Sequence, residues 1–194
     1  MVYMNNIIDM SLMQKAIDER RIHVFKNPFP DLPKWEKFMP VLHSYMARDQ
    51  LQFPDENVLD RNNLNTPYLS FQLRCRFWSR LTFQLYDGED PLENHIPELM
   101  PVLEWARSQY GERGVANTFA LVSLIANRGQ IGHKHEDYID QFQWQCIGTS
   151  IWRTGDNLES ENLIEPGDFI FVPKNIQHEI ETVTPRAVIN LVME

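Results

Sequence analysis

The hydrophobic and polar residues follow different patterns in the two halves of the chain. Before about residue 110 the apolar residues recur mostly at helical spacing, whereas after it they form short runs separated by turn residues. The clearest runs are TFALVSLIA (118–126), QFQWQCIGTSIW (141–152), DFIFVP (168–173) and RAVINLVM (186–193). Short apolar segments bounded by turn residues are typical of an antiparallel sandwich or barrel. The pattern therefore predicts a mainly β fold with flanking helices.

Three elements are expected before residue 48. Residues 9–21 have the spacing of a short helix, and RIHVF at 21–25 has the composition of a strand. Asp31 is a suitable N-cap, with Pro33 in the first turn of a helix that continues through Leu42.

The middle of the chain is less regular. The polar stretch 54–66 is typical of a loop, while 68–86 mixes aromatic residues with arginines and does not decide between helix and strand. Glu98 to Tyr110 has helical spacing, and Gly111 is placed to cap its C-terminus.

The segment QFQWQC at 141–146 alternates strictly between glutamine and apolar residues. Because successive side chains of a strand point to opposite faces, the three glutamines share one face and Phe142, Trp144 and Cys146 share the other. The alternation does not say which face is inside.

The composition favours one domain over residues 1–194, with a helical and mixed part at 1–115 and a β core at 116–194. The chain has 194 residues and 43% hydrophobic residues, enough for a sizeable core. Its net charge of -9 disfavours nucleic acid as the main partner, because phosphate backbones would be repelled.

The cysteines and the apolar runs bear on the compartment. Two cysteines without CxxC spacing define no disulfide framework, so we expect a reducing, cytoplasmic environment. The N-terminus lacks the pattern of a signal peptide, and no apolar run approaches the roughly 20 residues that span a bilayer. We therefore expect no membrane partner.

Two short segments between strand-like runs carry three of the six histidines: GHKHED at 132–137 and PKNIQHE at 173–179. Side chains at i and i+2 of an extended chain point to the same side, so His135 and Asp137 can converge on one ion, with His178 supplied by a later strand. Two imidazoles and one carboxylate leave the remaining positions of an octahedral ion open, which is the arrangement used by non-haem Fe(II) oxygenases.

A second register uses His133 and His135 as an HxH pair, with Asp140 and His178 completing the set. It has the spacing of cupins, although cupins have glutamate where Asp140 stands and glycine where Asn175 stands. In the first register His133 is a neighbour of the ion that faces the substrate.

Around the first register, the sequence resembles the JmjC family, in particular its protein-hydroxylating branch. The matching residues of the metal strand are Gly132, His135, Asp137, Phe142, Gln145 and Trp152, and those of the distal segment are Pro166, Gly167, Asp168, Pro173 and His178. The resemblance is specific over residues 130–194. It implies a double-stranded β-helix, the jelly-roll architecture shared with cupins. It also implies Fe(II) as the metal and 2-oxoglutarate as a cosubstrate, which is decarboxylated to succinate while O2 oxidises the substrate.

The far carboxylate of 2-oxoglutarate needs a cation or hydroxyl groups in a poorly hydrated site. Most JmjC relatives have a lysine or arginine for this purpose at the position of Ser150. Arg186 lies eight residues after His178, where many other 2-oxoglutarate oxygenases place their arginine, so we expect Arg186 to be the ionic partner and Ser150 a hydrogen-bond donor. Asn190 stands where the last strand of the family often has an asparagine. The alternatives are that Arg186 pairs with Glu179 or Glu181 on a surface, or that Arg153 binds the carboxylate.

The resemblance implies a hydroxylase acting on a protein or peptide side chain, with O2 as the oxidant, and His133, Trp144 and Gln145 are the candidate substrate-pocket residues. Fold analogy alone supports that substrate class. Two other functions stay open at this point: a cupin-type metalloenzyme that acts on a small molecule without 2-oxoglutarate, and a non-catalytic binding module.

Overall fold

Two antiparallel β-sheets form the body of the protein, which we describe from a computed structural model over residues 8–47, 82–86, 92–111, 114–124 and 134–193. The large sheet has the strand order β1-β7-β4-β9-β3-β2 and the small sheet has the order β6-β5-β8. The strands are β1 (His23–Phe25), β2 (Thr82–Tyr86), β3 (Val115–Ser123), β4 (Gln141–Ile147), β5 (Ser150–Thr154), β6 (Ser160–Ile164), β7 (Phe169–Val172), β8 (His178–Thr182) and β9 (Arg186–Met193). The helical elements are α1 (Met10–Asp18), α2 (Trp35–Ala47), α4 (Leu92–His95), the short 3-10 helix η2 (Pro97–Leu99) and α5 (Met100–Tyr110).

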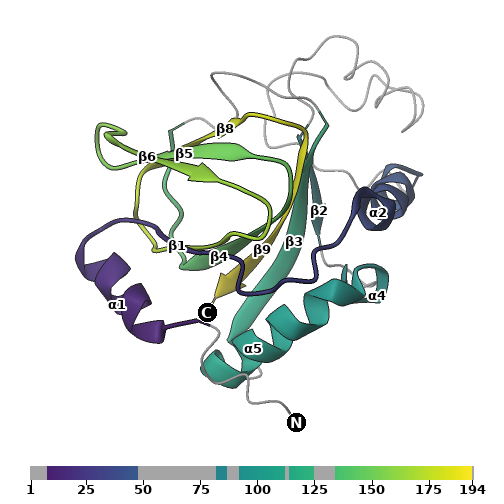
Figure 1. The fold of residues 1–194 in the computed structure, drawn as a ribbon, viewed down its shortest axis with the longest axis horizontal. Helices are drawn as coiled ribbons and strands as arrows, with labels where there is room; N and C mark the ends of the chain where they lie inside the picture. The colour runs from purple at the N-terminus through teal and green to yellow at the C-terminus, as the bar shows by residue number, and fades with distance from the viewer. Residues whose placement is uncertain (1–7, 48–81, 87–91, 112–113, 125–133, 194) are drawn as a thin grey trace.

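The two sheets pack face to face. A buried cluster between them takes Trp152, Ile164 and Ile180 from the small sheet and Ile170 and Val172 from the large one. Figure 1 shows the small sheet lying across the large one, with the strands curving around a common interior. This confirms the expected mainly β, double-stranded β-helix architecture with flanking helices.

The outer face of the large sheet carries the main hydrophobic core. Phe142, Trp144 and Cys146 of β4 pack there with alternate residues of β9 and with the buried faces of α1, α2 and α5. In Figure 1, α2, α4 and α5 lie along this side and α1 lies beside β1. Both faces of the central strands β4 and β9 are therefore buried, the outer one by helices and the inner one by the small sheet.

The helix ends follow from local chemistry, with one exception. Asp9 caps α1 by accepting from the backbone N–H of Ser11 at 2.9 Å, and Gly111 ends α5 at a φ of 81° that favours glycine. Asp31 does not cap α2, which begins only at Trp35. The reason lies in Pro33, because a proline disfavours helical geometry at the residue before it, and residues 30–34 belong to no helix or strand.

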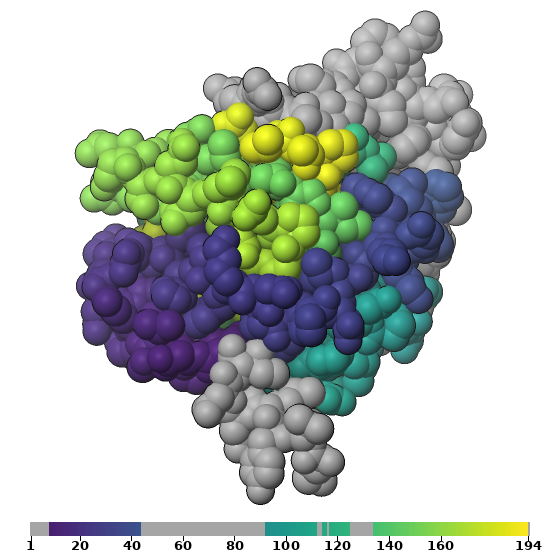
Figure 2. Space-filling model, viewed as in Figure 1, coloured from purple at the N-terminus to yellow at the C-terminus, as the bar shows by residue number. Residues whose placement is uncertain are grey.

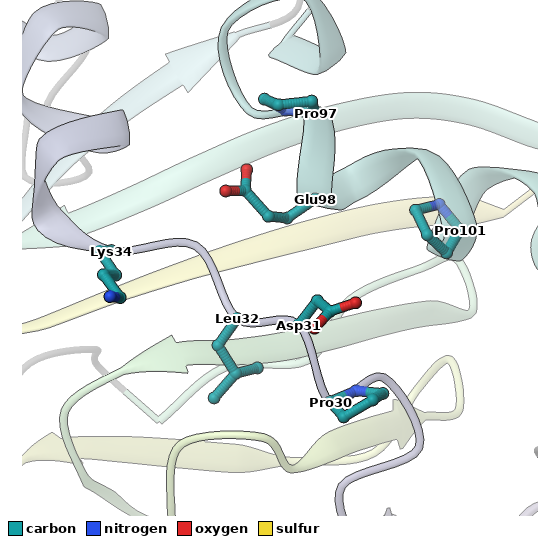
Figure 3. A pocket seen from close by; sticks show the side chains of 7 residues that line it. All are labelled: Pro30, Asp31, Leu32, Lys34, Pro97, Glu98 and Pro101. Carbon is teal, nitrogen blue, oxygen red and sulfur yellow. The ribbon is translucent and has the colours of Figure 1, made fainter.

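The segment at residues 30–34, before α2, crosses the surface of the molecule between the small sheet and α5 (Figure 2). A shallow open groove separates part of this segment, including Leu32 and Lys34, from Pro97, Glu98 and Pro101 at the start of the α5 region (Figure 3). None of the candidate metal ligands lines this groove. Among the described residues, no helix is long and apolar enough to cross a membrane.

Two turns between strands have a backbone conformation that favours glycine. Gly148, between β4 and β5, has a φ of 72°, and a Cβ there would clash with the carbonyl oxygen of Pro185. Gly167, before β7, has a φ of 99°, and Asp168 closes its turn by accepting from the Glu165 N–H at 2.9 Å while pairing with Lys26 at 2.7 Å. The Pro-Gly-Asp segment therefore serves as a structural turn directly before β7.

Candidate metal centre and cosubstrate site

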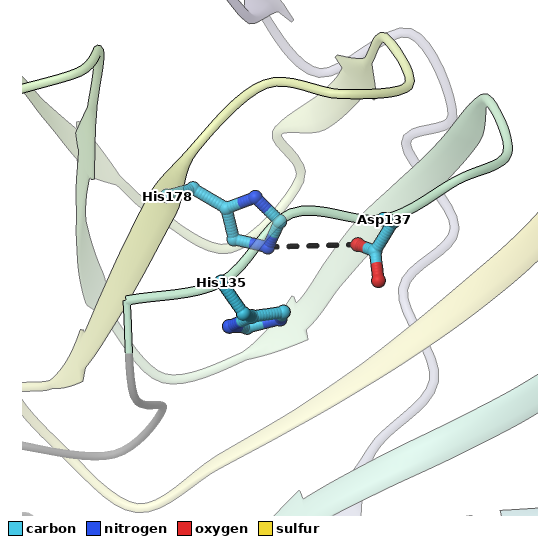
Figure 4. A group of neighbouring side chains, drawn as sticks. All are labelled: His135, Asp137 and His178. Atoms are coloured by element: carbon cyan, nitrogen blue, oxygen red, sulfur yellow. Dashed lines mark ion pairs between the residues drawn. The ribbon is translucent and has the colours of Figure 1, made fainter.

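The structure brings His135, Asp137 and His178 together. One ligand atom from each lies within 4.8 Å of the others, and these three are the cluster of metal-ligating side chains found among the described residues. Figure 4 shows His178 reaching from β8 toward His135 and Asp137, which come from the segment before β4. The two segments are joined by reciprocal backbone hydrogen bonds, His135 N to His178 O at 3.0 Å and His178 N to His135 O at 2.8 Å. The convergence is therefore fixed by the backbone.

The orientation of the His178 ring suits a metal ligand. Its Nδ1 lies 2.9 Å from the carbonyl oxygen of Ile176, so Nδ1 carries the proton and the Nε2 lone pair points toward Asp137, 3.6 Å away. The ring also stacks on Trp152, with centroids 5.1 Å apart. Burial, and in second place the charge of His135, lower the pKa of His178. The neutral imidazole that a metal requires is thereby favoured.

Asp137 is held by its neighbours as well. Its side chain accepts a hydrogen bond from the Gln141 amide, and its backbone carbonyl accepts from Asn175 N at 2.7 Å. The Asp137 side chain is 38% exposed and His135 is exposed, whereas the His178 side chain is only 1% exposed. The cluster thus has a closed side at His178 and an open side at His135 and Asp137.

The donor set fits a divalent transition metal. Metal–ligand bonds of about 2.1 Å place neighbouring ligand atoms roughly 3 Å apart. Side-chain rotations that move each ligand atom by about 1 Å would therefore bring all three onto one ion. The alternative HxH register needs His133 and Asp140 as well. His133 lies outside the described residues, and Asp140 accepts the backbone N–H of Lys174 at 2.7 Å.

The interior between the sheets contains buried polar atoms that have no hydrogen-bond partner among the described residues. They are Gln143 Nε2, Trp152 Nε1, Thr182 Oγ1, Asn190 Nδ2, and Nε and Nη1 of Arg186. Strand register places them on the inner faces, because Gln143 lies opposite Asn190, Arg186 shares the alternation of Asn190, and Trp152 lies opposite the buried Ile180. All of these atoms can donate. A region of unpaired donors calls for a ligand rich in acceptors, since an unmade buried hydrogen bond is costly.

Arg186 is the strongest of these donors. The residue is 1% exposed, and burial lowers the pKa of its guanidinium to about 10. The surface acids Glu179 and Glu181 are engaged elsewhere, because Arg153 contacts them at 3.5 and 2.7 Å on the outer face of the small sheet. Arg186 faces inward, which excludes a surface ion pair with Glu179 or Glu181. Arg153 faces solvent, which excludes it as the partner of a carboxylate bound in the interior.

Arg186 lies at the opposite end of the interior from the metal ligands. His178 begins β8 and Thr182 ends it, which separates the two ends by roughly 13 Å along the strand. The turn after Thr182 leads directly to Arg186, and the hydrogen bonds from Val183 N and Thr184 N to Thr149 O tie this turn to the start of β5.

The other expected site residues divide into two groups. Asn190 is 4% exposed and has the unpaired amide nitrogen described above. Ser150 is buried, but its hydroxyl donates to Gln145 Oε1 at 3.2 Å, and the Gln145 amide donates to the carbonyls of Ile147 and Gly148. Ser150 and Gln145 thus form a local network that braces the β4–β5 turn.

Trp144, expected in the substrate pocket, lies instead on the helix-covered face of β4. It is fully buried, and its ring meets that of Phe29 edge to face at a centroid distance of 6.1 Å. Sequence reasoning gave no site role to Gln143 or Thr182, although the QFQWQC alternation already placed Gln143 on one face with Gln145.

Comparison with known proteins identifies the fold. No protein-family model matches the sequence, and no curated protein sequence matches it. Among solved structures, the chain is similar to the Escherichia coli ribosomal oxygenase YcfD. One YcfD structure aligns over 96% of this chain with a TM-score of 0.62 and 14% identity. YcfD in complex with cobalt and 2-oxoglutarate aligns over 93% with a TM-score of 0.59 and 14% identity.

The YcfD complex with cobalt and succinic acid aligns over 93% of this chain, with a TM-score of 0.58 and 16% identity. The chain spans about half the length of these YcfD chains, with 51–52% of each covered. At this level of identity the likeness establishes a shared fold and no more. The chemistry of this chain has to be argued from its own residues.

Proposed function

We propose that this protein is an Fe(II)- and 2-oxoglutarate-dependent oxygenase that hydroxylates a side chain of a polypeptide. The single observation that carries the proposal is the pairing of two features at opposite ends of one interior. One end has a His-Asp-His cluster, and the other has a buried guanidinium with unpaired N–H groups. A small-molecule cupin that does not use 2-oxoglutarate has no need for the second feature.

The residues would divide the work as follows. His135, Asp137 and His178 would hold the ion and leave its remaining positions open, and Arg186 would bind the far carboxylate of the cosubstrate through charge-assisted hydrogen bonds. Bound Fe(II) with 2-oxoglutarate supplies O2 activation, coupled to decarboxylation of the cosubstrate to succinate and CO2. The protein's own contribution is orientation of the ligands and exclusion of water by the two packed sheets.

The choice of a polypeptide substrate has two supports. YcfD, which shares the fold, is described as a ribosomal oxygenase. In this chain the metal ligands are exposed on the His135 side, where Tyr138 is 80% exposed and Ile139 is 45% exposed directly after Asp137. An ion reached from the molecular surface can act on a side chain that projects from a larger partner. We place this activity in the cytoplasm, where the two cysteines stay reduced.

The test measures succinate formed from 2-oxoglutarate by purified protein with Fe(II), ascorbate and O2. We expect slow turnover without any protein substrate, loss of turnover in Asp137→Ala, and at least a tenfold rise in the KM for 2-oxoglutarate in Arg186→Met, because a charged hydrogen bond is worth about 1.5–3 kcal/mol. The matched control is Arg153→Met, which removes an arginine from the outer face of the small sheet and is expected to leave the KM unchanged. Failure of the wild-type protein to bind 2-oxoglutarate in the presence of Mn(II) would refute the proposal.

A further inference from the structure

The strand β4 presents three glutamines to the interior, and each meets a different environment. Gln141 donates to the carboxylate of Asp137 at the metal end. Gln145 donates to the carbonyls of Ile147 and Gly148 and accepts from Ser150 at the other end. Gln143, between them, is 1% exposed and its Nε2 has no partner among the described residues.

Gln143 has a counterpart on the neighbouring strand. The β4–β9 register places it directly opposite Asn190, which is 4% exposed and whose Nδ2 also lacks a partner in the described part of the chain. Opposite residues of an antiparallel pair have their side chains on the same face, with Cβ atoms about 5 Å apart. Two amide groups with unused N–H bonds therefore lie side by side in the interior.

The position of this amide pair selects what it can bind. Asn190 is four residues from Arg186, roughly 13 Å along β9, which is as far as the metal ligands lie from the Arg186 end. Its partner Gln143 is two residues from Gln141, which contacts the metal ligand Asp137. The pair thus belongs to the metal half of the interior. Amide N–H groups cannot form hydrogen bonds with the methylene groups in the middle of a dicarboxylate, but they can form them with carboxylate and keto oxygens.

We propose that Gln143 and Asn190 donate hydrogen bonds to the 2-oxo acid end of the cosubstrate. Gln143 is then a cosubstrate-positioning residue. This inference rests on the proposed function. It assigns separate tasks to the two ends of the interior: Arg186 recognises the far carboxylate, and the amide pair recognises the oxygens next to the ion. A ligand that keeps the 2-oxo acid but lacks the far carboxylate should still depend on Gln143.

Pyruvate is such a ligand, and it allows a crossed test against 2-oxoglutarate. Dissociation constants for both would be measured on the Mn(II)-loaded wild-type protein and on Gln143→Leu and Arg186→Met, by tryptophan fluorescence or by competition. We expect Gln143→Leu to weaken both ligands by a similar factor of about ten or more, since each loses a hydrogen bond to a charged group. Arg186→Met is expected to weaken 2-oxoglutarate only.

Thermal unfolding of the ligand-free variants separates ligand binding from a structural role. Gln143→Leu removes an unpaired buried donor and should not lower the Tm, whereas Gln145→Leu leaves two carbonyls and Ser150 without partners and should lower it. The inference is overturned if Gln143→Leu leaves both affinities unchanged, weakens 2-oxoglutarate alone, or lowers the Tm as much as Gln145→Leu. Failure of the proposed function gives a different result, because the Mn(II)-loaded wild-type protein would then bind neither ligand.

Discussion

Arg186→Met is predicted to make the ligand-free protein more stable while it weakens 2-oxoglutarate binding. The guanidinium is buried, with Nε and Nη1 unpaired among the described residues, and burial lowers its pKa from the usual, higher value of an arginine to about 10. Each pKa unit corresponds to about 1.4 kcal/mol, so the charge costs the folded state about 3 kcal/mol. Methionine has a similar length and carries no charge.

The sign of the effect follows from the direction of the shift. The folded-state pKa lies below the unfolded one, so at pH 7 the arginine is protonated in both states and the full cost is present. The cost disappears only as the pH rises from about 10 toward the usual pKa of an arginine, where the unfolded chain binds more protons. At neutral pH the substitution should therefore raise the free energy of unfolding by up to about 3 kcal/mol, or the Tm by about 6–12 °C for a protein of this size.

Differential scanning calorimetry at pH 7, with and without Mn(II) and 2-oxoglutarate, measures both halves of this prediction. Ligand at about one hundred times its Kd stabilises the wild-type protein by about 2.7 kcal/mol, and this gain should largely disappear in Arg186→Met. The Arg153→Met control should keep the ligand-induced gain. A lower Tm for ligand-free Arg186→Met would refute the reasoning, because it would mean that the guanidinium already has a stabilising partner within the protein.

Three further substitutions or modifications test the framework around the site. Gly148→Ala should lower stability by more than about 1 kcal/mol and weaken 2-oxoglutarate binding, since its Cβ would meet the backbone of Pro185 and displace the start of β9; unchanged affinity in a calorimetric titration would contradict this. Asp168→Ala should destabilise the protein by about 2 kcal/mol in urea unfolding, because it breaks a buried carboxylate's bonds, yet leave metal affinity intact. Burial raises the pKa of the Cys146 thiol, so in a Cys75→Ser variant Ellman's reagent should react only after unfolding, and rapid reaction of the native protein would count against the packed outer core.

The sequence predicted the metal cluster because its three ligands lie in two short, recognisable motifs. His135 and Asp137 are separated by one residue, so extended geometry puts them on one side of the chain. His178 was assigned from its place after a proline-bounded strand, in the distal segment that resembles the JmjC family. The strands β4, β7 and β9 were likewise visible as apolar runs. The strands β6 and β8 were not, because SENLI and HEIET are short and their outward residues are polar or acidic.

The faces of β4 could not be assigned from the sequence. Alternation predicts that Gln143 and Trp144 point in opposite directions, but both are fully buried, since helices cover one side of the large sheet and the small sheet covers the other. Trp144 was therefore placed on the wrong side relative to the site. The predicted helix start at Asp31 was wrong and α2 begins at Trp35, because the capping preference of aspartate was outweighed by the non-helical geometry that Pro33 favours at its predecessor.

The most direct test of the whole account is a crystal structure of the protein soaked with Mn(II) and N-oxalylglycine, a stable analogue of 2-oxoglutarate. We predict one ion bound by His135, Asp137 and the Nε2 atom of His178, with the far carboxylate of the analogue hydrogen-bonded to Arg186. An ion bound elsewhere, or an analogue that leaves the Arg186 guanidinium without a contact, would contradict it.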